Sequence, residues 1–125
     1  MSDAYNPVGW FEIPVTDMKR AKAFYEHVFQ VQLQEFEMGG TRMALFPMID
    51  NAKGSAGSLS MGEGYTPTQE GTLVYFTAPD IEATLARAKE KGGDVLLEKT
   101  SIGQEGFIAY MRDTEGNRVA LHSRQ

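Results

Sequence analysis

Apolar and polar positions follow the same pattern in two parts of the chain. Residues 8–33 and 71–96 align without a gap when Asp17 is placed on Asp80, an offset of 80 minus 17, or 63 residues. Each part begins with β-branched and aromatic residues, passes through an aspartate suited to cap a helix, and continues with apolar residues at helical spacing. The repeat therefore predicts a strand followed by a helix in each half of the chain.

Three further strand-like runs follow each predicted helix. In the first half they cover residues 31–38, 41–48 and 56–61, with a Gly39-Gly40 hairpin turn between the first two. In the second half they cover residues 94–99, 107–112 and 118–123. The pattern predicts an α+β fold of two tandem βαβββ modules in one domain, 1–125. We assign 6–62 to the first module, 63–71 to a connector rich in Gly, Pro and Thr, and 72–125 to the second module.

Each helix covers one face of its four-stranded sheet, so the other faces must meet each other or a partner chain. A curved pair of such mixed sheets is expected to enclose a cavity. With 125 residues, of which 42% are hydrophobic, the chain has enough apolar material for one core. The turn 113–117 needs only local turn chemistry to explain its polar residues.

Charge and composition exclude several classes of protein. The net charge of −5 comes without a basic run, which argues against a nucleic-acid partner. No apolar stretch approaches the roughly 20 residues that span a bilayer, and the start "MSDAYNP" does not resemble a signal peptide. We therefore expect no membrane partner and a cytoplasmic location. The absence of cysteine excludes disulfides, thiolate metal sites and a cysteine nucleophile.

Two segments extend the comparison beyond the pattern of elements. The paired modules, "VTDMKRAKAFYEHVF" at 15–29 and "RDTEGNRVALH" at 112–122 resemble the vicinal oxygen chelate superfamily. That superfamily groups glyoxalase I, bleomycin-resistance proteins, fosfomycin-resistance enzymes and extradiol dioxygenases. Within it, the chain more closely resembles bacterial proteins described as related to lactoylglutathione lyase. The resemblance implies a glyoxalase/bleomycin resistance fold and a homodimer.

The resemblance also implies positions for metal ligands. Members of the superfamily usually place a His seven residues before the first helix-capping Asp, a second His at the equivalent point of the second module, and a Glu on the last strand. Here these positions hold Trp10, Leu73 and Ala120, which cannot ligate a metal. The chain has two histidines, His27 and His122, and we expect His27 on the outer helix surface. The sequence therefore predicts no metal and no other cofactor.

The same positions predict which side chains line the cavity, since alternate residues of a strand share a face. The predicted ligand-binding residues are Trp10, Glu12, Leu73, Tyr75, Arg118, Ala120 and His122. The residues between them should face the helices as core: Phe11, Ile13, Val15, Val74, Phe76, Val119 and Leu121.

Glu12 is expected to be a buried carboxylate in a mostly apolar cavity. In one interpretation it pairs with Arg118 or His122 and holds the sheets together, since a buried carboxylate must be paired or protonated. In another, burial raises its pKa and makes it a general base or a hydrogen-bonding group for a ligand. The candidate catalytic residues are therefore Glu12 and His122.

The favoured function is a metal-independent small-molecule binding protein of the glyoxalase/bleomycin-resistance type, with Glu12 anchoring an amphipathic or aromatic ligand. The alternative is a glyoxalase-related lyase or isomerase that acts on a small carbonyl compound. There Glu12 would abstract a proton while Arg118, His122 or Tyr75 stabilised the oxyanion. A third possibility is a vestigial cavity in a dimer that serves as an interaction module.

Overall fold

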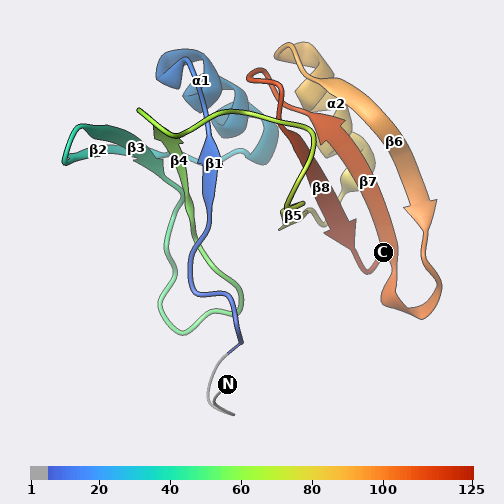
Figure 1. Ribbon diagram of the computed structural model, residues 1–125. Coiled ribbons are helices and arrows are strands. Elements are labelled where there is room, and N and C mark those ends of the chain that lie inside the picture. The colour runs from blue at the N-terminus through green and yellow to red at the C-terminus, as the bar shows by residue number, and fades with distance from the viewer. Residues whose placement is uncertain (1–5) are drawn as a thin grey trace.

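The computed structural model describes residues 6–125 and confirms the two βαβββ modules (Figure 1). The first module consists of β1 Glu12–Pro14, α1 Met18–Phe29, β2 Gln34–Met38, β3 Thr41–Leu45 and β4 Ser58–Met61. The second consists of β5 Tyr75–Thr77, α2 Ile81–Glu90, β6 Asp94–Ser101, the 3-10 helix Gly103–Glu105, β7 Phe107–Arg112 and β8 Arg118–Ser123. Residues 1–5 of the predicted domain lie outside the described residues.

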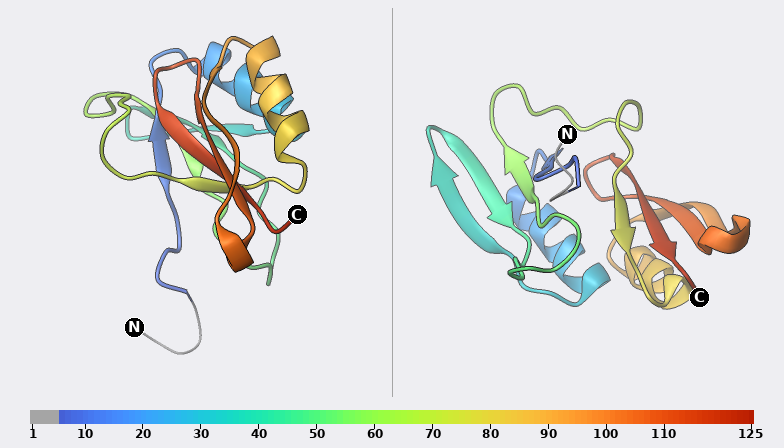
Figure 2. Two further views of the ribbon diagram at one scale, coloured as in Figure 1. Left: turned by 90° about the vertical axis from the view of Figure 1, so that its right-hand side faces the viewer. Right: turned by 90° about the horizontal axis from the view of Figure 1, so that it is seen from below.

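Each module forms its own four-stranded mixed sheet. The strand orders are β1-β4-β3-β2 and β5-β8-β7-β6, and in both sheets the first strand runs parallel to the last while the other neighbours are antiparallel. Figures 1 and 2 show α1 and α2 on one side of the molecule, with the two sheets diverging from them. Within this chain, the two sheets do not close around a cavity. Among residues 6–125, both helices are too short and too polar to span a bilayer.

The predicted aspartate caps begin both helices. The side chain of Asp17 accepts a hydrogen bond from the backbone N–H of Arg20 at 3.1 Å, and Asp80 accepts one from Ala83 at 3.0 Å. Each cap satisfies an N–H group that has no partner within its helix. Helix α1 ends where Gln30 adopts a left-handed conformation with φ 55°, and Gly92 follows α2 with φ 93°.

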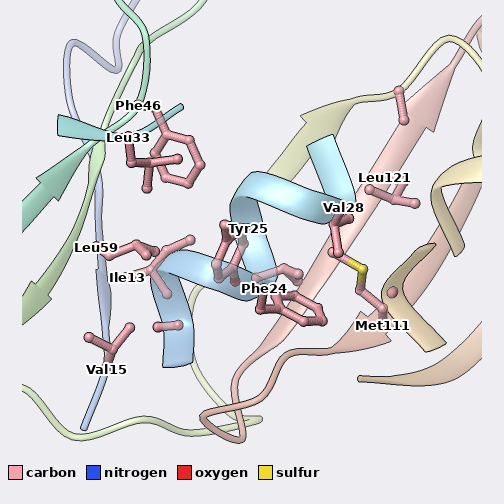
Figure 3. Packing of buried hydrophobic residues seen from close by; sticks show 14 of the residues in the cluster. Ile13, Val15, Phe24, Tyr25, Val28, Leu33, Phe46, Leu59, Met111 and Leu121 are labelled. Carbon is pink, nitrogen blue, oxygen red and sulfur yellow. The ribbon is translucent and has the colours of Figure 1, made fainter. Parts of the chain in front are cut away.

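Helix α1 is shared by the cores of both modules. In Figure 3, its side chains lie between residues of the first sheet and residues of the second. The aromatic rings of Phe29 and Phe76 stack across the module boundary with centroids 4.5 Å apart. Of the predicted helix-facing residues, Ile13, Val15, Val119 and Leu121 are buried, as the alternation predicts. The other three, Phe11, Val74 and Phe76, are half-buried.

The turn at 113–117 fastens the second module to the first. The Oε1 atom of Glu115 accepts hydrogen bonds from the N–H groups of Thr16 at 2.9 Å and Asp17 at 2.8 Å, and its Oε2 atom accepts one from Arg20 Nε at 2.7 Å. Two neighbours add contacts of the same kind: Tyr25 Oη donates to Asp113, and Asn117 Nδ2 donates to the carbonyl oxygen of Pro14, both at 2.7 Å.

This turn corrects an expectation from the sequence. Asp113 does accept bonds from the N–H groups of Glu115 and Asn117, as turn chemistry predicts. Turn chemistry alone is nevertheless a wrong account, because side chains of the turn also form hydrogen bonds with α1 and with the end of β1 in the first module. We refer to residues 113–117 and these partners as the inter-module clamp.

Glu115 is ionised in the clamp. Burial acts to raise the pKa of its carboxyl group, but the hydrogen bonds from Arg20 and from the N–H groups of Thr16 and Asp17 outweigh burial and lower that pKa to about 2. The side chain of Glu115 is 0% exposed, whereas that of Arg20 is 51% exposed. The carboxylate therefore depends on protein donors instead of water.

We expect Glu115→Gln to lower the free energy of unfolding by about 2 kcal/mol, because it weakens several hydrogen bonds to a charged acceptor. In the wild type this stabilisation is fully present above the ordinary carboxyl pKa of 4.5 and is lost as the pH falls toward 2. Urea unfolding between pH 7 and pH 3 measures both effects. The control is Glu37→Gln, at an exposed position of β2. A Glu115→Gln protein as stable as the control at pH 7 would contradict the clamp.

Candidate functional site

A pocket of about 360 Å³ lies at the boundary between the modules. This volume is within the range of about 300–1,000 Å³ that is typical of small-molecule sites. One wall is β1, which pairs only with β4 and so leaves its other edge free; the opposite wall is the start of β8, and the connector contributes the remainder. The lining residues are Phe11, Glu12, Ile13, Pro14, Thr68, Glu70, Thr72, Val74, Asn117, Arg118 and Val119.

Arg118 supplies the positive charge of this pocket. Its guanidinium carbon lies 5.5 Å from the centre of the Tyr110 ring, a cation–π arrangement, and its Nε atom is buried with no hydrogen-bond partner. Within residues 6–125, its guanidinium group has no carboxylate or carbonyl acceptor. The other five arginines each donate to a protein oxygen: Arg20, Arg42, Arg87, Arg112 and Arg124. A half-buried guanidinium without an acceptor is suited to an anionic or carbonyl ligand.

Glu12 lies on the opposite wall, and the expectation that it is buried is wrong for this chain. Its side chain is exposed because β1 is the edge strand of its sheet. The carboxylate accepts a hydrogen bond of 2.8 Å from Tyr65 Oη, so neither of the predicted partners, Arg118 and His122, pairs with it. Sequence reasoning missed Tyr65, although a single aromatic residue in a connector rich in Gly, Pro and Thr was the available signal.

Three predicted residues share the face of the second sheet that no helix covers. Tyr75 is 47% exposed, Ala120 beside it is fully buried, and His122 is half-buried. The Nε2 atom of His122 lies 2.7 Å from the carbonyl oxygen of Glu105, and since a carbonyl only accepts, Nε2 carries the proton. His122 therefore holds the 102–106 loop and does not line the pocket of Glu12.

Trp10 and Leu73 lie apart from this pocket. Trp10 is 39% exposed and precedes β1, where it lines a second pocket of about 340 Å³ with residues of the 47–56 loop. Leu73 is half-buried and lies two residues before β5. The predicted single cavity is thus a wrong expectation, because Trp10 and Glu12 line different pockets.

A metal ion does not fit the donor groups that are present. The three positions that the resemblance assigns to ligands hold an indole, an isobutyl group and a methyl group, at Trp10, Leu73 and Ala120. In the part of the chain that the structure describes, no group of three or more His, Asp or Glu side chains is arranged to hold a metal ion. A divalent ion needs several such donors that converge on one point.

Comparison with known proteins gives the family. The profile of the Glyoxalase/Bleomycin resistance protein/Dioxygenase superfamily matches residues 8–121. The chain belongs to this superfamily. This confirms the resemblance drawn from the sequence, and the two βαβββ modules confirm the fold expected for it.

Individual relatives are distant. A "Glyoxylase-like domain-containing protein" of Didymella fabae is 27% identical over 96% of this chain and 95% of its own length. The "Metallothiol transferase FosB" of Shouchella clausii is 28% identical over 94% of this chain and 80% of its own length. The crystal structure of glyoxalase I from Zea mays superposes with a TM-score of 0.68 and 22% identity. It covers 99% of this chain, which in turn spans 48% of the maize chain.

The contact between Tyr65 and Glu12 can be tested by titration. The pKa of Tyr65 is raised, first because its hydroxyl donates to the Glu12 carboxylate and then by burial and by the nearby negative charge. We expect Glu12→Gln to lower the pKa of Tyr65 toward 10, the ordinary value. Carbon NMR of ring-labelled tyrosine measures this pKa, with Tyr65→Phe to assign the signal and Glu37→Gln as the control. An unchanged Tyr65 titration in Glu12→Gln would show that the pair does not form in solution.

Proposed function

We propose that this protein binds a small amphipathic molecule, without a metal, in the pocket between β1 and β8. The observation that carries the proposal is Arg118, the one arginine in residues 6–125 whose guanidinium group has no protein acceptor although its Nε atom is buried. Leaving such a group unpaired is costly, and a ligand oxygen would complete its hydrogen bonds.

The remaining wall residues define the kind of ligand. The half-buried side chains of Phe11 and Val74 offer apolar surface, while Glu12 and Arg118 place opposite charges on facing walls. A ligand with an apolar body, a hydrogen-bond donor at one end and an anionic or carbonyl oxygen at the other would satisfy both charges. Metal independence is supported by the absence of donors at Trp10, Leu73 and Ala120.

We propose in addition that the protein works as a homodimer. The faces of the sheets that the helices leave uncovered carry exposed apolar side chains, among them Phe36 at 51% and Met38 at 61% exposure. These residues lie on β2, on the far side of the first sheet from β1. A second copy of the chain would cover this surface and leave the pocket at the module boundary accessible.

The second candidate function is a lyase or isomerase that acts on a small carbonyl compound. It is favoured by one feature of the pocket, which sets the exposed carboxylate of Glu12 across from the unpaired guanidinium of Arg118. Glu12 would accept a proton from the carbon next to the carbonyl group, and Arg118 would stabilise the oxyanion that forms. His122, bonded to the 102–106 loop, has no part in this version.

Binding is tested by thermal shift against a library of small amphipathic compounds. We expect some of them to raise the melting temperature of the wild type, and Glu12→Gln and Arg118→Gln each to reduce that rise, since each removes a charge from the pocket. Arg118→Gln should itself melt close to the wild type, because Arg118 has no hydrogen-bond acceptor within residues 6–125 to lose. The control is Arg124→Gln, at an exposed position. A rise in the melting temperature that both pocket variants retain would rule out this pocket.

Catalysis is tested separately with the hemithioacetal of methylglyoxal and glutathione and with related activated carbonyl compounds. If the protein is a lyase or isomerase, we expect turnover that Glu12→Gln abolishes, because an amide cannot accept the proton. Absorbance assays follow the loss of substrate, with Glu37→Gln as the matched control. Full activity in Glu12→Gln would exclude Glu12 as the base.

A further inference from the structure

The uncovered face of the second sheet is organised in rows that run across its strands. Residues paired across neighbouring strands project from the same face. One row contains Asp94, Arg112 and Arg118, from β6, β7 and β8. The next contains Tyr110, Ala120 and Tyr75, from β7, β8 and β5. A charged row thus lies directly beside an aromatic row.

The aromatic row has a small residue at its centre. Ala120 is fully buried, and the rings of Tyr75 and Tyr110 on either side of it meet edge to face with centroids 6.4 Å apart. The pKa of Tyr75 is raised, mainly by its hydrogen bond with Tyr110 and by burial. Because only one of the two hydroxyl groups donates in that bond, the other keeps its proton available to a ligand.

The charged row leaves one positive charge uncompensated. Arg112 pairs with Asp94 across β6 and β7, whereas Arg118, its cross-strand neighbour on β8, has no acceptor in residues 6–125. The carboxylate of this row is thus already engaged by Arg112. The row thus holds two neighbouring guanidinium groups and one carboxylate, which pairs with the Arg112 end, so the Arg118 end attracts a further anion.

We propose that Arg118, Tyr75 and Tyr110 form a subsite for the carboxylate group of a planar organic acid. The subsite adjoins the pocket between β1 and β8, since Arg118 lines both. It deepens the proposed function, on which it rests, by naming the chemical class of the ligand. A carboxylate is flat and matches the fork of donors on a guanidinium group, and the phenol hydroxyls lie in the adjacent row.

The planar body of the acid is assigned to the exposed ring of Tyr75. Arg118 already lies over the face of Tyr110, so Tyr75 is the ring of this row with its surface open. Aromatic groups pack on such a ring offset or edge to face. Ala120 carries no charge, whereas a Glu at this position would place a carboxylate two residues from Arg118 on the same face and repel the bound anion.

Benzoate is the probe for this subsite, and benzamide is its neutral counterpart of the same shape. In nitrogen NMR of the full chain, we expect benzoate to shift the Nε–Hε signal of Arg118 saturably, with Arg118→Gln used to assign that signal. The backbone N–H signals of Tyr75 and Tyr110 should shift with it, and they measure the affinity in every variant that keeps these residues. We expect Arg118→Gln and the change from benzoate to benzamide each to weaken binding at least tenfold, as the loss of one charge-assisted hydrogen bond does. Tyr75→Leu should weaken it about threefold, and Arg124→Gln not at all.

Urea unfolding of each variant shows whether it is folded. If Arg118→Gln were unstable, Arg118→Lys would replace it, because Lys keeps the charge without the planar fork and should weaken benzoate binding by less. Equal affinity for benzoate and benzamide, or no saturable shift, would overturn the subsite. Neutral amphipathic compounds could still raise the melting temperature of the wild type and not that of Glu12→Gln. The proposed function would then stand without the carboxylate subsite. If nothing bound at all, both would fall.

Discussion

The carboxylate of Glu115 holds the start of α1 in the first module against the last turn of the second, and the other features described above depend on this contact. It is buried, ionised and surrounded by donors from Thr16, Asp17 and Arg20. A buried carboxylate is stable only when such donors replace water. Satisfying the charge therefore fixes how the two modules sit against each other.

The pocket is a direct result of that contact. Asn117, at the end of the same turn, donates to the carbonyl oxygen of Pro14, which brings the end of β1 to the start of β8. Glu12 lies two residues before Pro14, and Arg118 immediately follows Asn117. The clamp thus determines which two charges face each other across the pocket. The superfamily fold determines the arrangement of strands and helices, while the side chains at the module boundary determine the chemistry of the pocket.

Much of the fold could be predicted from local sequence patterns. The repeat, the two aspartate caps and the alternation along β1 and β8 depend on residues that are close in the sequence. The structure has the strands, helices and caps that these patterns predict. The alternation also indicated the face on which Glu12 lies. The alternation could not indicate whether that face is buried, because its burial depends on whether another sheet or another chain packs against it. Glu12 was expected to be buried for this reason, and in this chain it is exposed on an edge strand.

The sequence by itself determined the elements, their order, the superfamily and the loss of the usual metal donors, because each is carried by residue types at fixed short spacings. Only the tertiary structure decided that the 113–117 turn clamps the modules, that Tyr65 binds Glu12 and that the guanidinium group of Arg118 has no hydrogen-bond acceptor within residues 6–125. Thr16 and Glu115 are 99 residues apart, and Tyr65 and Glu12 are 53 residues apart. Contacts between residues so far apart cannot be recognised from a periodic pattern in the sequence, because they form only when the packed modules bring distant side chains together.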